Sequence, residues 1–218
     1  AMQDLAINAP LPYTSALGLP ELRAAIAGFY KTTHQIELDP QRIVVTAGAS
    51  AALLLLSAAF VDEGDNVIMA DPSYPCNKQF IKSFGGKVQL VPTQADSHFQ
   101  LNMALLEKYW QAGTRGLMLA TPSNPTGTAI APDELAAMCQ FARSKGAWRI
   151  VDEIYLNLHH GEADSQPMSV LSFDDEALVI NSFSKYFGMT GWRLGWCVVP
   201  TRAVEVMERL AQNYYICP

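Results

Sequence analysis

The sequence lacks basic runs and long hydrophobic runs, and each absence removes one class of expected partner. Its 218 residues carry 15 lysines and arginines against 21 acidic residues, and the net charge of -6 argues against a nucleic-acid-binding surface. The longest apolar stretch, residues 49–61, is too short to span a bilayer. Residues 1–12 lack the basic start and apolar middle of a signal peptide. We therefore expect neither nucleic acid nor a membrane as a partner.

The sequence also lacks the residue clusters that bind metals. Its four cysteines are scattered without metal-ligand spacing, and we expect free thiols in a cytoplasmic protein rather than a disulfide framework. They are Cys76, Cys139, Cys197 and Cys217. His159 and His160 are adjacent but have no cysteine or carboxylate partners at ligand spacing. No metal site is expected.

Apolar segments alternate with helical patterns along most of the chain. Half of the residues are hydrophobic and 17% are charged, a composition typical of a core-rich soluble domain. The predicted strands lack strict polar alternation, which indicates burial on both faces. They span residues 43–46, 66–70, 87–91, 116–120, 148–151, 177–180 and 194–199. We predict a three-layer α/β/α sandwich around a mainly parallel mixed sheet of about seven strands, formed by residues 1–218 as one domain.

The predicted helices lie between these strands. The helix that begins near Ser50 is apolar nearly all round and should be buried, and the last helix should run from Pro200 to the end of the sequence. The others span residues 18–30, 77–84, 102–112 and 132–145. Polar motifs follow several strands directly. Because ligands of parallel sheets bind beyond the carboxyl ends of the strands, these motifs are candidate site residues.

Residues 181–195, NSFSKYFGMTGWRLG, follow one predicted strand and contain Lys185 among small and aromatic residues. No acidic residue lies between Glu176 and Glu205. We expect the Lys185 amine to be desolvated beside the cationic Arg193, which would lower its pKa and make it a usable nucleophile. The alternative, typical of a lone lysine, is a surface side chain on a loop.

A second candidate is an anion site at the start of the buried helix. The small-residue turn at residues 47–50 would present the backbone N–H groups of Ala49 and Ser50 and the Ser50 hydroxyl. Ser182, Ser184 and Arg193 could complete the site, with the arginine as a fork for a dianion. Tight strand-to-helix packing is the alternative explanation for this turn.

The lysine segment, Ser-x-x-Lys185 followed by Gly-x-x-Gly-x-Arg193, resembles the Schiff-base lysine segment of class I/II aminotransferases. These are pyridoxal-phosphate enzymes of the aspartate-aminotransferase fold, type I. The motifs Asn124-Pro-Thr-Gly and Asp152-Glu-x-Tyr155 occur in the family's order, and the similarity extends from Tyr13 to Gly195. The resemblance implies that Lys185 forms a Schiff base with pyridoxal 5'-phosphate.

The resemblance also implies a role for each polar residue at a strand end. Asp152 would pair with the protonated pyridine nitrogen and keep the ring an electron sink. Asn124 and Tyr155 would donate hydrogen bonds to O3′, and Tyr74 would stack on the ring. The anion site would hold the phosphate. Each residue also has an ordinary alternative: a helix cap or ion pair for Asp152, a turn for Asn124, and packing for the two tyrosines.

Tyr13 suggests a site shared between two chains. Tyr-x4-Gly-Leu-x2-Leu-Arg23 fits a pattern in which the tyrosine reaches the phosphate of the neighbouring subunit's cofactor, so the resemblance implies a homodimer. A surface tyrosine is the alternative. The family's N-terminal arm and small C-terminal domain, which carries the arginine for the substrate carboxylate, are not recognised in residues 1–218. We therefore expect the large, cofactor-binding domain of a longer enzyme.

The resemblance implies amino-acid metabolism, with transfer of an amino group from an α-amino acid to a 2-oxo acid. Lys185 would be the base and acid that moves the proton between Cα and C4′. One alternative is a pyridoxal-phosphate-dependent C–S β-lyase of the same fold, which needs the same residues. An alternative from another class is a pyridoxal-phosphate-binding regulatory domain of a transcription factor. The identity of the amino acid is not predicted.

Overall fold

A computed structural model describes residues 12–158 and 167–218, and within them the chain forms one seven-stranded sheet. The strand order is β1-β7-β6-β5-β4-β2-β3. β7 is antiparallel to both of its neighbours, whereas the remaining pairs are parallel. The strands are β1 (Ile43–Thr46), β2 (Asn66–Asp71), β3 (Lys87–Pro92), β4 (Thr114–Ala120), β5 (Trp148–Asp152), β6 (Leu178–Ser182) and β7 (Gly195–Val198). The predicted mainly parallel mixed sheet is confirmed.

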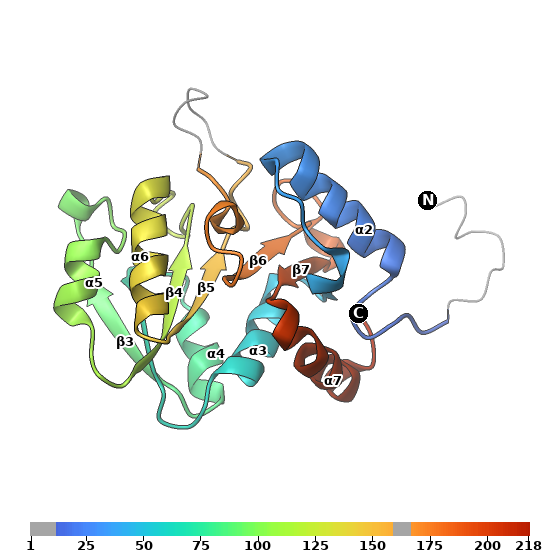
Figure 1. Cartoon of the computed structure of the whole chain (residues 1–218), viewed down its shortest axis with the longest axis horizontal. Coiled ribbons are helices and arrows are strands. Elements are labelled where there is room, and N and C mark those ends of the chain that lie inside the picture. Colours follow the sequence, from blue (N-terminus) through green and yellow to red (C-terminus); the bar gives the residue numbers. More distant parts are fainter. Residues whose placement is uncertain (1–11, 159–166) are drawn as a thin grey trace.

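Helices cover both faces of the sheet and complete the three predicted layers (Figure 1). One core cluster joins the sheet to α2 (Pro20–Phe29), α5 (Met103–Tyr109) and α6 (Pro132–Ser144). The other joins it to α3 (Ala49–Phe60), α4 (Asn77–Ser83) and α7 (Val204–Tyr215). A chain that alternates strands and helices can bury both faces of a parallel sheet in this way.

The helix α3 and the end of α7 illustrate how local sequence shapes these elements. Ala52, Leu53 and Leu56 of α3 are buried against the sheet, as the apolar sequence predicts. The prediction that the last helix runs to the end of the sequence is wrong. α7 ends at Tyr215, because Ile216 adopts a φ of 68°, which a right-handed helix cannot contain.

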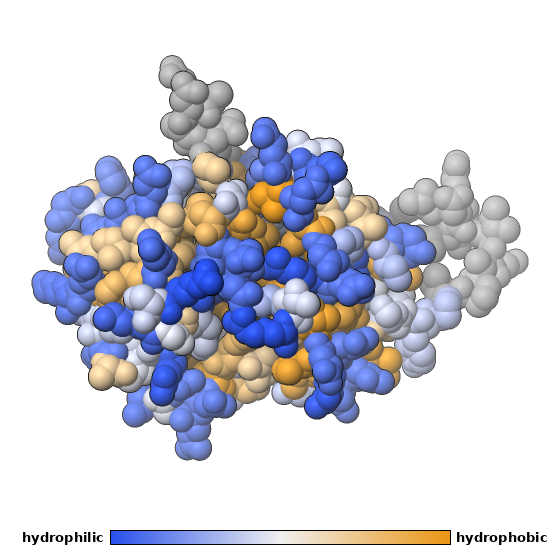
Figure 2. All heavy atoms as spheres, viewed as in Figure 1, coloured by the Kyte–Doolittle hydropathy of each residue, from blue (hydrophilic) through white to orange (hydrophobic). Residues whose placement is uncertain are grey.

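The surface is mixed in character. Figure 2 shows hydrophilic side chains spread over most of the visible face, with apolar groups between them. None of the helices in the described part of the chain is both long enough and apolar enough to cross a membrane.

Candidate active site

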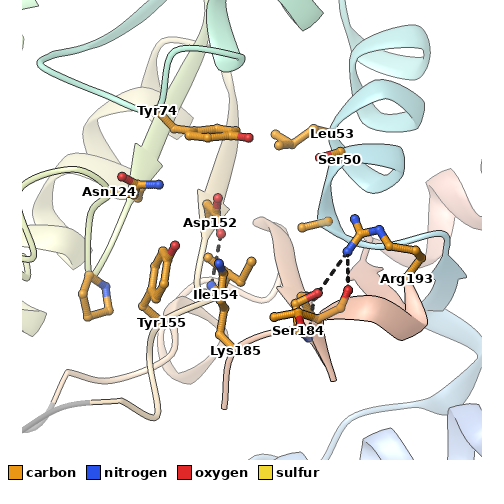
Figure 3. A pocket seen from close by; sticks show the side chains of 15 residues that line it. Ser50, Leu53, Tyr74, Asn124, Asp152, Ile154, Tyr155, Ser184, Lys185 and Arg193 are labelled. Atoms are coloured by element: carbon orange, nitrogen blue, oxygen red, sulfur yellow. Dashed lines mark hydrogen bonds between the residues drawn. The ribbon is translucent and has the colours of Figure 1, made fainter. Parts of the chain in front are cut away.

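A pocket of about 230 Å³ lies at the carboxyl ends of β4, β5 and β6, beside the first turn of α3 (Figure 3). Segments far apart in the sequence contribute to it, and they include ten of the predicted site residues. These are Ala49, Ser50, Tyr74, Asn124, Asp152, Tyr155, Ser182, Ser184, Lys185 and Arg193. Strand ends that meet at one edge of a parallel sheet bring such residues together.

Asp152 provides a buried carboxyl group on the floor of the pocket. It ends β5, is 7% exposed, and its Oδ1 accepts a hydrogen bond of 3.0 Å from the Ile154 N–H. Burial raises the pKa of Asp152 to about 6, against which this hydrogen bond acts. At neutral pH the group is therefore mostly ionised. A buried carboxylate that faces a pocket is stabilised by a cationic partner placed there.

Arg193 provides positive charge on the other side of the pocket. It follows the short 3₁₀ turn Thr190–Trp192, and its φ of 54° turns the chain back toward the sheet. Its Nη1 donates to Ser184 Oγ at 3.3 Å and to the Thr190 carbonyl at 2.9 Å. Ser182 Oγ in turn accepts from the Ser184 N–H at 3.0 Å. The two serines and the arginine are therefore held together as one polar wall.

Two glycines let this wall lie directly against α3. A Cβ atom on Gly48 would be 2.5 Å from Arg193 Nη2, and one on Gly195 would be 2.9 Å from the Ala49 nitrogen. Gly48 also has a φ of 79° and a ψ of 173°, a conformation that is essentially restricted to glycine. Because the first N–H groups of a helix have no intrahelical acceptor, Ala49 and Ser50 offer donors beside the guanidinium. This part of the pocket fits a dianionic phosphate group.

Replacing Gly48 with alanine is expected to weaken this anion site. The new methyl group would displace the Arg193 guanidinium and impose a strained backbone, with a loss of about 1–3 kcal/mol in stability. Phosphate and pyridoxal-phosphate affinity should fall about tenfold or more, as titration calorimetry can measure. Gly28→Ala in α2 is the matched control, because its Cβ would meet open space and the helix should gain about 0.5–1 kcal/mol. Unchanged affinity in Gly48→Ala would contradict this assignment.

Lys185 lies on the turn after β6, and its Nζ is 5.4 Å from the centre of the Tyr155 ring. The prediction that this amine is buried is wrong for the chain by itself, since Lys185 is exposed. The turn extends beyond the end of the sheet, and the following Tyr186 and Phe187 are 48% and 38% exposed. Within the described residues, the walls of the pocket therefore leave the amine open to solvent.

Tyr74 and Asn124 line the remaining side of the pocket. In Figure 3 the Tyr74 ring lies across the pocket from Lys185, with Asp152 between them. A hydrogen bond with the Cys76 side chain, followed by partial burial, raises the pKa of the Tyr74 hydroxyl. An aromatic ring on one side and a lysine amine on the other suit a flat heteroaromatic ligand.

Several pocket residues were not predicted from the sequence. Leu53, Ile154 and Thr190 line the pocket together with Ala120 and Pro122. Helical spacing could have identified Leu53, which lies one turn after Ala49 and Ser50. Thr190 lies between the two glycines of the lysine segment, and its carbonyl holds Arg193. Because Thr190 holds Arg193 through its backbone carbonyl, the type of its side chain gives no indication of this role in the sequence.

Three predictions concern residues away from this pocket. Tyr13 is 80% exposed and is not among the pocket residues, so its role toward a neighbouring subunit stays a prediction. The four cysteines are free. No cluster of metal-binding side chains occurs in residues 12–158 and 167–218, and His159 and His160 lie outside this part.

The fold and the pocket define a class of protein: a three-layer α/β/α domain that presents a lysine, a buried carboxylate and an anion site at one sheet edge. A family model for aminotransferase class I and II matches residues 1–218. The chain belongs to this family, whose members use pyridoxal phosphate. The family resemblance and the cofactor that it implied are confirmed.

Similar proteins carry related names. Valine–pyruvate aminotransferase of Mycobacterium tuberculosis is 41% identical over 95% of this chain and 53% of its own length. Aspartate aminotransferase of Sulfolobus acidocaldarius is 36% identical over 94% of this chain and 52% of its own length. A crystal structure of an aminotransferase from Mycobacterium tuberculosis superposes with a TM-score of 0.94 at 40% identity, covering all of this chain and 58% of that one. The chain spans about half the length of these relatives.

Proposed function

We propose that this chain binds pyridoxal phosphate through Lys185 and takes part in moving an amino group from an α-amino acid to a 2-oxo acid. The observation that carries the proposal is the pocket itself. Its anion site, buried carboxylate and lysine amine occur in one cavity of a chain that belongs to the aminotransferases. Each of the three matches one part of the cofactor: the phosphate, the ring nitrogen and the aldehyde.

The residues of the pocket divide the work of holding the cofactor. Arg193, the two serines and the first turn of α3 bind the phosphate. Asp152 would pair with the protonated ring nitrogen, and Tyr74 would cover the ring. Asn124 and Tyr155 would donate hydrogen bonds to the phenolic oxygen O3′. When bound in this way, the cofactor serves as a sink for the electrons released when the substrate Cα loses its proton.

Lys185 has two successive tasks. Its Nζ is the nucleophile that would hold the cofactor aldehyde covalently, with loss of water, until a substrate amine replaces it. The freed amine would then carry a proton between the substrate Cα and the cofactor C4′, as base in one direction and acid in the other. The centre of the Tyr155 ring lies 5.4 Å from this amine.

A C–S β-lyase of the same fold would use the same pocket, and a regulatory domain would bind the same cofactor. The names of the relatives favour transfer, since valine–pyruvate and aspartate aminotransferases are both among them. These names differ in substrate, so the proposal extends to an α-amino acid without specifying its side chain. It also includes a cytoplasmic homodimer in which Tyr13 reaches the neighbouring subunit's phosphate, and residues 1–218 as the cofactor-binding domain.

Titration with a panel of amino acids tests the proposed reaction. The protein is purified as its gene encodes it, loaded with pyridoxal phosphate, and mixed with each amino acid in turn. We expect at least one amino acid to convert the visible band of the lysine-bound cofactor to that of pyridoxamine phosphate, with one equivalent of 2-oxo acid released. Pyruvate, ammonia and thiol formed from a cysteine conjugate, without pyridoxamine phosphate, would identify the lyase. Cofactor binding without turnover of any amino acid would favour the regulatory domain.

A further inference from the structure

Glu153 carries a fully buried carboxyl group that has no role in the proposed reaction. It lies between the two pocket residues Asp152 and Tyr155 in the chain but faces the opposite side of the sheet. Burial first, and then the Glu153 carboxyl, raises the pKa of Tyr30, which packs on that side with Val151 and Trp196. Asp152 lies on the other face of the sheet, where Ile150 and Ile180 belong to the same core cluster as residues of α3. The two adjacent carboxyl groups are therefore separated by the sheet.

Glu153 connects three segments that meet behind the pocket. Its backbone N–H donates to the Ile180 carbonyl of β6, and its carbonyl accepts from the Leu156 N–H, both at 2.9 Å. The second bond closes the turn that carries Tyr155. Its side-chain Oε1 accepts from the Val170 N–H at 2.7 Å, where the short 3₁₀ turn Val170–Ser172 begins. This side chain therefore fixes the returning chain to the end of β5.

The surroundings of the Glu153 side chain do not suit a charged group. The described side chains near it are Tyr30 after α2, Cys139 of α6 and Ser169 before Val170, with Asp152 across the sheet, and none of these is a cation. Its second oxygen, Oε2, is buried without a hydrogen-bond partner among the described residues. A carboxylate there keeps the hydrogen bond of the Val170 N–H but has no cationic partner among these side chains, so its burial costs more than that of a neutral carboxyl group. Burial raises the pKa of Glu153 to about 8, although hydrogen bonds from the Val170 N–H and the Ser169 side chain act against this shift.

We propose that Glu153 is a positioning residue of the cofactor site: a protonated carboxyl group that fixes Val170 to the end of β5 and adds no second negative charge beside Asp152. Fixing both sides of the turn keeps Asp152 and Tyr155 directed into the pocket. The neutrality of Glu153 matters because a second negative charge beside Asp152 would favour protonation of Asp152 and weaken its pairing with the ring nitrogen. This role depends on the proposed binding of pyridoxal phosphate.

The proton on Glu153 can be tested without enzyme activity. The folded-state pKa of about 8 lies above the ordinary value of 4.5, so the stabilisation is complete below 4.5 and is lost as the pH rises through 8. The unfolding temperature of the unaltered protein, measured with and without pyridoxal phosphate, should fall between about pH 5 and about pH 9. Glu153→Gln keeps an oxygen acceptor for Val170 but does not titrate, so its curve should be flatter over this range.

Glu134→Gln is the matched control, because the half-buried Glu134 side chain also accepts a backbone hydrogen bond, from Met103. Its curve should parallel that of the unaltered protein. A Glu153→Gln curve that also runs parallel would overturn the protonation of Glu153. The comparison of unfolding temperatures across the pH range tests the protonation of Glu153 whether or not the protein binds the cofactor.

The positioning role is tested by cofactor binding. Glu153→Ala, which leaves the Val170 N–H without its partner, should bind pyridoxal phosphate about tenfold more weakly and shift the pH midpoint of its visible band. Glu153→Gln should restore both properties toward those of the unaltered protein. Equal impairment in Glu153→Gln and Glu153→Ala would show that the negative charge is needed and overturn the proposal, as would unimpaired binding in Glu153→Ala. Failure of the unaltered protein to bind the cofactor would instead overturn the proposed function.

Discussion

A protein with Lys185 replaced by alanine is expected to bind pyridoxal phosphate without a covalent bond and to lose amino-transfer activity by about 10⁴-fold or more. In the proposed function, the Lys185 amine both attacks the cofactor aldehyde and carries the Cα proton. The phosphate and ring contacts come from other residues and remain intact, so the cofactor should still bind. Absorbance of the protein with pyridoxal phosphate, and the rate of a single turnover with an amino acid, measure the two effects.

Lys108→Ala provides the matched control for this prediction. Lys108 is an exposed lysine of α5 whose amine lies 5.2 Å from the ring centre of Tyr109, a contact similar to that of Lys185 with Tyr155. Its substitution should leave both the visible band and the turnover rate unaltered. Undiminished turnover in Lys185→Ala would refute the assignment of Lys185, and an equal loss in both variants would point to a general effect of removing a lysine.

Replacing Asp152 with asparagine is expected to reduce kcat/KM by about 10²–10³-fold, because removal of one member of a buried charge pair leaves the other charge uncompensated. Asparagine preserves the size of the side chain but cannot stabilise a protonated ring nitrogen. The pH dependence should change as well. With the pKa of Asp152 at about 6 before the cofactor binds, affinity for pyridoxal phosphate in the unaltered protein should fall as the pH drops through 6. Asp152→Asn should lack this fall.

Asp174→Asn separates the effect on the cofactor from an effect on folding. Asp174 is also buried, at 4% exposure, but its carboxylate is held by Arg149 through hydrogen bonds of 2.6 and 2.8 Å. This variant should lose about 3–5 kcal/mol of stability and keep the unaltered pH dependence of cofactor affinity. Cofactor affinity in Asp152→Asn that still falls through pH 6 would exclude Asp152 as the titrating group.

Much of this fold is encoded in local sequence signals. Short apolar segments without alternation predict buried parallel strands, and the polar motifs at their ends predict which edge of the sheet holds the site. Asn124, Asp152 and Lys185 could be selected in this way because each follows a predicted strand. Their meeting around one pocket then depends only on the parallel arrangement.

Other features depend on contacts that are distant in sequence. The position of β7 between β1 and β6 brings Gly195 against the first turn of α3, and no local pattern in the sequence specifies that contact. The exposure of Lys185 was predicted incorrectly because the neighbouring Phe187 packs against Phe29 and Trp196, whereas the Lys185 amine lies over the Tyr155 ring. The environment of Glu153 was also missed, since only the packing around it reveals that none of the described residues that shift its pKa is a cation.

The site of covalent attachment tests the central claim most directly. The purified protein is loaded with pyridoxal phosphate, reduced with borohydride and digested, and its peptides are analysed by mass spectrometry. We predict one phosphopyridoxyl group on the peptide that contains Lys185, in the unaltered protein and in Lys108→Ala, and none in Lys185→Ala. Attachment to a different lysine, with Lys185 unmodified in the unaltered protein, would contradict the account.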